Sequence, residues 1–247
     1  MNVHPNPRDT AQEPNMPPNL VIIQCDQMRA FDVGCYGHPS VRTPNIDRLA
    51  AEGVRFETAV STTPICSPAR AALLAGQHAR TCVGSVGNCG MEGAEPGRER
   101  FPEVTLAERL QEGGYQTELI GKWHTWDHPN DCGFDHSLHP LPPHLHYGQR
   151  YFEDRDTEGF VVDGFGPRYE LGRVGDFLAE RAGRKDRPFF LHYNPGPPHM
   201  PLGPGHAPKR YLEMYDPGAV PLRGNVFNDC GEPAYDERWF KHYTIWD

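Results

Sequence analysis

Short runs of apolar, β-branched residues alternate along the chain with amphipathic stretches that carry helix start and stop signals. The apolar runs predict buried strands, and the amphipathic stretches predict helices that cover the resulting sheet. Strands are expected over residues 20–25, 54–60, 116–120 and 189–193, and helices over residues 43–53, 65–76, 105–113 and 169–181. This alternation predicts an α/β fold, a three-layer α/β sandwich with a mostly parallel central sheet.

The helix predicted over residues 65–76 begins beside a thiol. Ser67 is the expected N-cap and Pro68 the expected first helical residue, with Cys66 just before them. Arg70, four residues after Cys66, can lie on the same side of the first turn. A reactive thiol, a fixed positive charge and a helix N-terminus then converge, and such an arrangement binds anions. For this motif alone, a buried thiol before an ordinary helix stays open as the alternative.

Polar residues follow two of the predicted strands. Asp26 and Gln27 come directly after the first, where an open α/β sheet collects ligands, and could offer hard oxygen ligands to Ca²⁺ or Mg²⁺. Lys122 and His124 follow the third strand, and they point to the same face if the chain stays extended there. The alternatives are an N-cap Asp at a strand-to-helix turn, a solvated Lys and a loop His.

Composition limits the classes of protein that the chain can represent. Its 247 residues suffice for one large α/β domain, and its formal net charge of −9 argues against nucleic acid or an anionic membrane as a partner. No apolar run approaches membrane-spanning length. Residues 1–18 are polar and rich in Pro and Asn, so a disordered tail without a signal peptide is expected. Seven cysteines without a small-scaffold framework favour a reducing compartment, and a cytoplasmic location is expected.

Two groups of cysteine and histidine residues are not expected to bind a metal ion. Cys82 and Cys89 lie in a Gly-rich segment with a spacing that matches no common zinc pattern, so free thiols are expected. Residues 127–147 hold five histidines, but the spacing of the prolines and the lack of an ordered frame favour a loop over a metal site.

Four motifs follow one another along the chain. They are Thr-Pro-Asn-Ile-Asp at 43–47, Cys-Ser-Pro-Ala-Arg at 66–70, Gly-Lys-Trp-His at 121–124 and His-Met-Pro at 199–201. Together they resemble the signatures of the type I sulfatases, a family within the alkaline phosphatase superfamily. The resemblance covers residues 18–223 and therefore extends over nearly the whole chain.

The resemblance implies catalytic roles for five residues: Cys66, Arg70, Lys122, His124 and His199. In the family, a maturation enzyme oxidises the motif cysteine to formylglycine, an aldehyde whose hydrate is the nucleophile. Arg70 and Lys122 would orient and neutralise the diol and the sulfate. His124 and His199 would serve the leaving-group side, one of them as general acid. Asn88 is a weaker match to a residue that contacts the substrate.

The resemblance also implies a divalent metal, with Ca²⁺ as the first expectation and Mg²⁺ or Mn²⁺ as alternatives. Asp26, Gln27 and the oxidised Cys66 would be its ligands. The family places further ligands (an Asp with an Asn or a His) and another Lys well downstream of His199, and no such motif is found before Asp247. Residues 19–247 are therefore expected to be the N-terminal part of a longer catalytic domain.

The expected function is hydrolysis of small anionic sulfate esters. Gln27 stands where many relatives carry a second Asp, and this form resembles a subset that includes phosphonate monoester hydrolases. Hydrolysis of phosphonate monoesters or phosphodiesters is therefore the first alternative. The missing downstream ligands motivate the second alternative, an inactive fragment that only binds anions or a partner.

Overall fold

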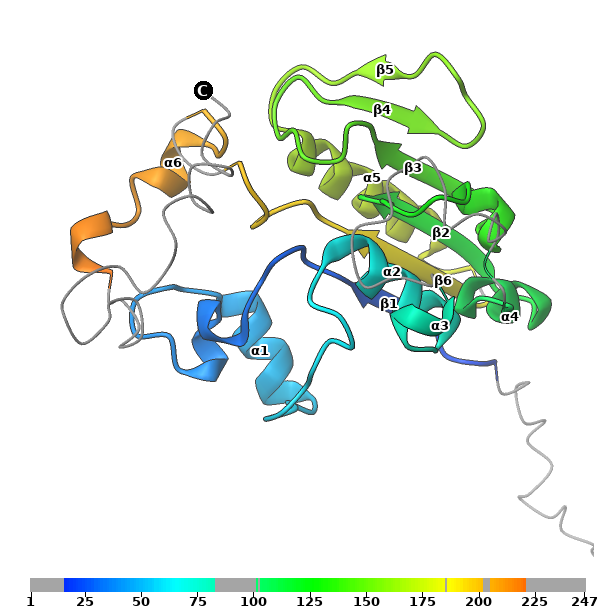
Figure 1. The fold of residues 1–247 in the computed structure, drawn as a ribbon, viewed down its shortest axis with the longest axis horizontal. Helices are drawn as coiled ribbons and strands as arrows, with labels where there is room; N and C mark the ends of the chain where they lie inside the picture. The colour runs from blue at the N-terminus through cyan, green and yellow to red at the C-terminus, as the bar shows by residue number, and fades with distance from the viewer. Residues whose placement is uncertain (1–15, 83–100, 102, 185, 202–204, 221–247) are drawn as a thin grey trace, which may run out of the picture.

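A computed structural model describes residues 16–82, 101, 103–184, 186–201 and 205–220. Its centre is a six-stranded sheet with the strand order β1-β6-β2-β3-β4-β5 (Figure 1). The strands are β1 (Leu20–Ile23), β2 (Gln116–Gly121), β3 (His136–Pro140), β4 (Arg150–Glu153), β5 (Phe160–Val161) and β6 (Phe189–Asn194). The first four strands in that order are parallel to one another. β4 pairs antiparallel with β3, and β5 pairs antiparallel with β4.

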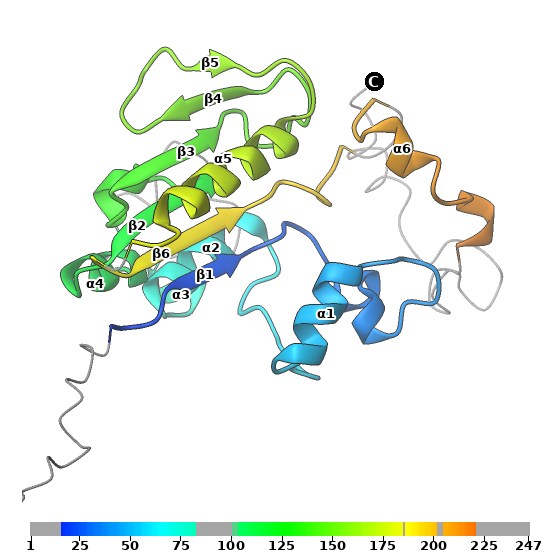
Figure 2. The same cartoon turned by 180° about the vertical axis from the view of Figure 1, so that it is seen from behind.

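Helices cover both faces of this sheet. Figures 1 and 2 show α5 (Gly166–Arg181) on one face and three helices on the other: α2 (Cys66–Ala75), α3 (Ala79–Cys82) and α4 (Leu106–Glu112). The expected three-layer α/β sandwich with a mostly parallel sheet is confirmed. Because helices cover both faces of the parallel part of the sheet, the residues of β6 are all buried and those of β2 are buried from Thr117 onward.

The core has one hydrophobic layer on each face of the sheet. Leu119 of β2 packs in one cluster with Leu74 of α2 and Ala107 of α4. The next residue, Ile120, packs on the opposite face with Val174 of α5. Successive side chains of a strand point to opposite faces, so one apolar strand supplies both layers. Each fully buried aliphatic side chain contributes about 2 kcal/mol to folding.

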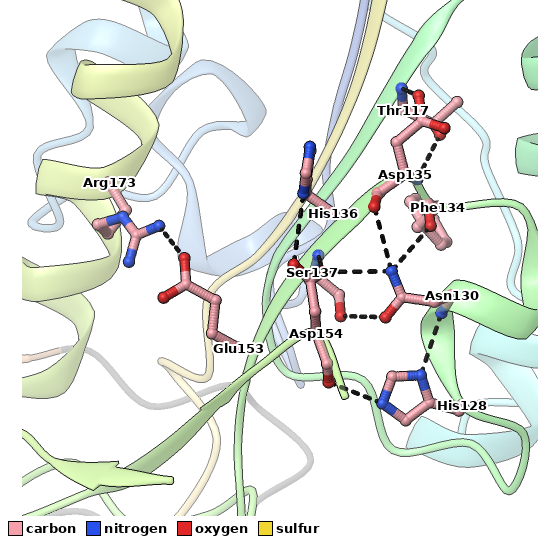
Figure 3. Close-up of polar contacts among 10 residues, drawn as sticks. All are labelled: Thr117, His128, Asn130, Phe134, Asp135, His136, Ser137, Glu153, Asp154 and Arg173. Atoms are coloured by element: carbon pink, nitrogen blue, oxygen red, sulfur yellow. Dashed lines mark hydrogen bonds and ion pairs between the residues drawn. The ribbon is translucent and has the colours of Figure 1, made fainter. Parts of the chain in front are cut away.

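A polar cluster joins the start of β3 to η3 and to Asp154, the residue that follows β4 (Figure 3). The side-chain amide of Asn130, in η3 (Pro129–Cys132), donates to the carbonyls of Phe134 and Asp135 and to Oδ1 of Asp154, the last at 3.2 Å. The same Oδ1 accepts the backbone N–H of Ser137 at 2.7 Å. These bonds satisfy polar groups at the start of β3, where the chain must turn into the sheet.

An arm lies beyond the β1 edge of the sheet in both views (Figures 1 and 2). It contains η1 (Ala30–Asp32), η2 (Gly34–Tyr36), α1 (Pro44–Glu52), α6 (Lys209–Leu212) and η4 (Pro217–Ala219). The Tyr215 hydroxyl accepts the N–H of Arg42 at 3.1 Å and so joins segments that are far apart in sequence. Within the described part of the chain, no helix has the length and apolar character needed to cross a membrane.

Two strand predictions need correction. Residues 54–60 alternate in polarity, but they form no strand, and Val54 and Val60 are more than four-fifths exposed. Alternation can only produce a strand where a partner strand is available, and none of the described strands pairs with this segment. The strand predicted at 20–25 is present as β1, but it is mostly exposed because it lies at the sheet edge.

Other boundaries also differ from the sequence analysis. The His-rich residues 127–147, predicted as a loop, contain β3, and α5 begins at Gly166 rather than at residue 169. Clustered His and Pro residues obscure the sequence pattern of a strand here. The strand forms because it is hydrogen-bonded to β2 on one side and to β4 on the other. The expected tail at 1–18 lies almost wholly outside the described residues, as do Asn88 and Cys89.

The start of α2 differs from the sequence prediction by two residues. Ile65, not Ser67, is the N-cap residue, with extended backbone angles, and its carbonyl accepts the N–H of Ala69 at 3.0 Å. Pro68 is tolerated within the first turn of the helix because the first four N–H groups of a helix have no intrahelical acceptor. Cys66 is therefore the first residue of the helix rather than a residue before it.

Candidate active site

Parallel strands bring three site residues to one edge of the sheet. Asp26 follows β1, Lys122 directly follows β2, and His199 follows β6. The backbone fixes their relative positions: the N–H of Lys122 donates to the carbonyl of Asn194 at 2.8 Å, and the N–H of Asp26 donates to the carbonyl of Pro195 at 3.4 Å. The carboxyl ends of parallel strands are where α/β sheets bind ligands.

Two buried cations surround one carboxylate. The Lys122 ammonium forms an ion pair with Oδ2 of Asp26, and Arg70 Nη2 lies 3.6 Å from the same oxygen. Arg70 also donates from Nη1 to the carbonyl of Lys122 at 2.9 Å. The Lys122 side chain has no exposed surface and that of Arg70 is 3% exposed, so this positive charge is fixed in place.

Burial and pairing compete in setting the charges of this group. Burial alone would raise the pKa of Asp26, but Lys122 and Arg70 outweigh that effect and lower it. Burial lowers the pKa of Lys122, and Asp26 partly offsets this change. The carboxylate is therefore ionised at neutral pH, and two cations against one anion leave the site with an excess of positive charge.

Cys66 completes this group from the start of α2. One ligand-type atom from each of Asp26, Cys66 and His199 lies within 4.8 Å of the other two. A carboxylate oxygen, a sulfur and an imidazole nitrogen at such separations could hold a divalent metal ion. The thiol also lies at a helix N-terminus, where anions are stabilised.

Histidines form a second layer on the site. The ring of His144 stacks on that of His199, with centroids 4.3 Å apart, and meets the edge of His124 at 5.2 Å. Nδ1 of His144 lies 3.2 Å from the Lys122 ammonium and can accept from it. The sequence analysis missed His144, because a histidine in a Pro-rich stretch carries no periodic signal; its position just after an unrecognised strand was the only available indication.

Backbone contacts determine which nitrogen of His199 carries a proton. His199 Nδ1 lies 2.6 Å from the carbonyl of Met200, and a carbonyl only accepts, so Nδ1 is the donor. The Nε2 atom of the neutral ring is then the acceptor. His146, a second residue that the sequence analysis missed, donates from Nε2 to the carbonyl of His199 at 3.0 Å and holds this segment in place.

The imidazoles of the site are neutral at pH 7. Burial, followed by the positive charge of Lys122, lowers the pKa of His124 to about 4 and that of His144 to about 3. Burial also lowers the pKa of His199. An imidazole in this site becomes protonated readily only when added negative charge compensates the cations.

The structure brings together Asp26, Cys66, Arg70, Lys122, His124 and His199, directly or through His144. The expectation that Lys122 and His124 lie on one face of an extended segment was wrong. The chain leaves the extended conformation at Gly121 (φ 94°), and His124 has φ 55°. Gln27 is exposed, with φ 62°. Its proposed role as a metal ligand stays a prediction.

A small cavity of about 130 Å³ adjoins His124. Four buried polar atoms of its lining have no hydrogen-bond partner among the described residues: His124 Nδ1, Thr125 Oγ1, Trp126 Nε1 and His139 Nδ1. Buried polar atoms of this kind usually bind ordered water. The cavity is therefore polar and is large enough for a few water molecules behind the imidazole.

The fold and site together define a class of protein. An α/β sheet carries, at the carboxyl ends of its strands, a helix-start thiol, buried cations, a carboxylate and neutral imidazoles. This combination is suited to group transfer from an anionic ester, because it provides a nucleophile position, charge neutralisation and proton carriers. The class is that of α/β proteins with an anion-binding site at the carboxyl edge of the sheet.

Comparison with known proteins makes the class specific: residues 18–225 match the sulfatase family. The chain belongs to the sulfatase family. It is 31% identical to the ulvan-active sulfatase of Formosa agariphila over 245 residues, covering 93% of this chain and 45% of that enzyme. It is also similar to a solved structure of a protein bound to its substrate D-glucosamine-2-N,6-O-disulfate, with a TM-score of 0.71, 30% identity and coverage of 86% of this chain and 40% of that one.

A hydrolase with another specificity shares the fold. The phosphonate monoester hydrolase of Agrobacterium radiobacter superposes with a TM-score of 0.61 and 25% identity, covering 83% of this chain and 45% of that one. The curated sulfatases match at higher identity. The chain spans less than half the length of the first curated relatives that it matches over most of its own length.

Proposed function

We propose that this chain supplies the nucleophile and the anion-binding half of an enzyme that hydrolyses small sulfate esters. One observation carries the proposal: Cys66, at the start of α2, lies beside Asp26, which is paired with two buried cations. A sulfate ester carries one negative charge, which matches the excess positive charge of the site. Membership of the sulfatase family supports the same reaction.

Arg70 and Lys122 bind and orient the sulfate in this proposal. Burial holds both side chains in fixed positions, so little reorganisation is needed when negative charge moves onto the sulfate oxygens. His199 and His124 handle protons on the leaving-group side. A bound sulfate offsets the cations, so it raises the pKa of these rings and allows one of them to act as general acid.

Cys66 and Asp26 fit the groups that the family implies. Oxidised to formylglycine by a maturation enzyme, Cys66 would supply a hydroxyl nucleophile whose sulfate ester can be released again by re-forming the aldehyde. Asp26 offers a hard oxygen at this point, with Gln27 as its chain neighbour, and these donors suit Ca²⁺, with Mg²⁺ or Mn²⁺ as alternatives. Two or three oxygen ligands are few for Ca²⁺, so tight binding requires further ligands.

Hydrolysis of phosphonate monoesters or phosphodiesters is the second candidate. It is supported by the neutral Gln27 beside Asp26 and by the fold shared with the phosphonate monoester hydrolase. Turnover of an aryl sulfate and of an aryl phosphodiester at matched concentrations, by protein produced together with a maturation enzyme, separates the two candidates. A higher kcat/KM for the sulfate supports the proposal, and a higher kcat/KM for the phosphodiester overturns it.

A further inference from the structure

The cavity of about 130 Å³ beside His124 lies at the carboxyl edge of the sheet. Its lining comes from residues 123–129, which follow β2, and from four residues between His139 and Pro143, at the end of β3 and just after it. β2 and β3 are parallel neighbours, so both segments leave the sheet at the edge that carries the candidate active site. His124 belongs to both places: it lines the cavity, and its ring meets that of His144 in the site at 5.2 Å.

The unmet hydrogen-bonding capacity of this lining is concentrated on four side chains. Other polar groups of the lining are bonded to protein. Trp123 Nε1 donates to the carbonyl of Asp127, and both ring nitrogens of His128 have backbone partners. Four buried atoms have no such partner among the described residues: His124 Nδ1, Thr125 Oγ1, Trp126 Nε1 and His139 Nδ1. Burying polar atoms without partners costs stability, so the four atoms mark a place where water is held.

Water can satisfy all four groups, because it both donates and accepts. Trp126 Nε1 only donates, and Thr125 Oγ1 can donate or accept. The Nδ1 atom of a neutral imidazole donates or accepts, depending on the tautomer. One water molecule takes roughly 30 Å³ in the liquid, so the cavity of about 130 Å³ has room for more than one.

The charges around His124 determine how its ring meets this water. Lys122 and Arg70 each act on the ring more strongly than the Asp26 carboxylate does, and neither cation lines the cavity. In a neutral imidazole, the protonated nitrogen is the positive end of the ring dipole and the other nitrogen is the negative end. The tautomer with its proton on Nδ1 turns the positive end toward the water of the cavity and leaves Nε2 without a proton, so we expect this form to be the more stable one.

We propose that water held in this cavity anchors His124 through its Nδ1–H. The side chains that hold the water, those of Thr125, Trp126 and His139, are then positioning residues for the imidazole. A ring held in this way can take up a proton at Nε2 without turning, because Nδ1 donates to the same water in the neutral and in the protonated ring. The inference rests on the proposed function only where His124 handles protons, and the anchoring itself needs no substrate.

The test reads the tautomer of His124 in the whole chain, with ¹⁵N-labelled histidine and without substrate. The NMR shifts of the ring nitrogens distinguish a protonated from an unprotonated nitrogen, and His124→Gln assigns the signals. We expect the wild-type ring to be mainly in the Nδ1–H form at pH 7. Trp126→Phe and, separately, Thr125→Val each remove one hydrogen bond to the water, so each should lower the ratio of Nδ1–H to Nε2–H rings about fivefold.

The variants are chosen to keep the packing around the cavity. Trp126→Phe retains an aromatic ring where Trp126 stacks on Phe101, with centroids 4.8 Å apart. His139→Phe, which should shift the tautomer ratio in the same direction, retains a ring where His139 stacks on Phe152. A melting temperature close to that of the wild type confirms that the fold is kept.

Thr117→Val is the matched control for Thr125→Val. Both hydroxyls are buried, but that of Thr117 donates to the carbonyl of Gly133 at 2.7 Å and lies outside the cavity. Thr117→Val should therefore lower the melting temperature and yet leave the tautomer ratio of His124 unchanged.

Three results would overturn the proposal: a wild-type His124 ring that is mainly in the Nε2–H form, a tautomer ratio that Trp126→Phe and Thr125→Val leave unchanged, or a crystal structure in which the cavity is dry. Failure of the matured protein to hydrolyse sulfate esters would count against the proposed function alone, because the tautomer is measured without turnover.

Discussion

Lys122 shows how single residues define the chemistry of this site. Its side chain has no exposed surface, yet it remains paired with Asp26, and its carbonyl accepts from Arg70. Removing one partner of a buried ion pair leaves an uncompensated charge, so such pairs are sensitive to mutation. The same pair prepares the site for a second anion, because one carboxylate neutralises only one of the two cations.

Sulfate should change the protonation of His124. The free ring has a pKa of about 4, because burial and Lys122 disfavour the imidazolium. A bound anion stabilises the imidazolium, so we expect inorganic sulfate to raise this pKa by on the order of one unit. An NMR titration of the ring signals with and without sulfate measures the shift. His139 is the control. Its pKa is also about 4, but burial and His128 lower it rather than Lys122, so sulfate should leave the pKa of His139 unchanged. An unchanged His124 pKa under saturating sulfate would contradict the assignment.

Glu170 should make the protein less stable as the pH rises. It is buried in α5 and accepts the Tyr151 hydroxyl at 2.8 Å, and burial raises its pKa to about 7 from 4.5. Below pH 4.5, Glu170 is protonated in both states and has no effect. Between pH 4.5 and 7 only the unfolded state ionises, so stability falls by about 3 kcal/mol and then levels off.

Glu170→Gln removes this titration and keeps an acceptor for Tyr151. Urea unfolding gives the free energy of unfolding of the wild type and of the variant at pH 4.5 and at pH 8. The difference, variant minus wild type, should be about 3 kcal/mol larger at pH 8 than at pH 4.5. Parallel pH profiles for the wild type and the variant would show that Glu170 is not the responsible group.

At the scale of elements, Gly121 links β2 to the site. It has φ 94°, and an added Cβ would lie 2.4 Å from the carbonyl oxygen of Asn194 in β6. Gly121→Ala should therefore destabilise the protein by about 3 kcal/mol or more, through backbone strain and a clash with backbone. Gly114→Ala is the matched control: φ is 85°, but the space around it is open, so strain alone should cost about 1 kcal/mol. Equal losses in thermal and urea unfolding would contradict this account.

Elements could be predicted from sequence where the local signal and the tertiary environment agree. β6 is a largely apolar run and is buried on both faces, and the capping box of Thr105 and Glu108 starts α4 as expected. Residues 54–60 carry an equally clear alternation but no partner strand, and a single sequence does not reveal which partners are present. β3 has the opposite problem, since its His and Pro residues conceal a strand that its neighbours stabilise.

The same contrast applies to the site. Cys66, Arg70, Lys122 and His199 lie in motifs with fixed spacing, so their convergence could be predicted. His144 could not, because its role comes from ring stacking and from contact with a lysine far along the chain, which no local pattern encodes.

At the scale of the whole molecule, a positive site is set into a negatively charged chain. The formal net charge is −9, whereas the described site pairs two buried cations with one carboxylate. Local charge therefore governs binding of a small anion, while the overall charge disfavours large polyanions.

The most direct measurement is turnover of an aryl sulfate by the matured protein, alone and together with the C-terminal portion of the ulvan-active sulfatase, the part of that enzyme that this chain does not match. The variants are Cys66→Ser and, as control, Cys35→Ser in η2 of the arm. Both are small changes, so the free energy of unfolding should move by about 1 kcal/mol or less. The mass of the peptide that contains Cys66 shows whether the thiol has become an aldehyde.

We predict that the wild type and Cys35→Ser carry the aldehyde and release sulfate, and that Cys66→Ser folds but gives no turnover. Serine cannot form the hydrate that expels sulfate, so no compensation is expected at this position. Equal sulfate release by Cys66→Ser, or no release by aldehyde-bearing wild type in either setting, would contradict the central claim that Cys66 is the nucleophile of a sulfatase site.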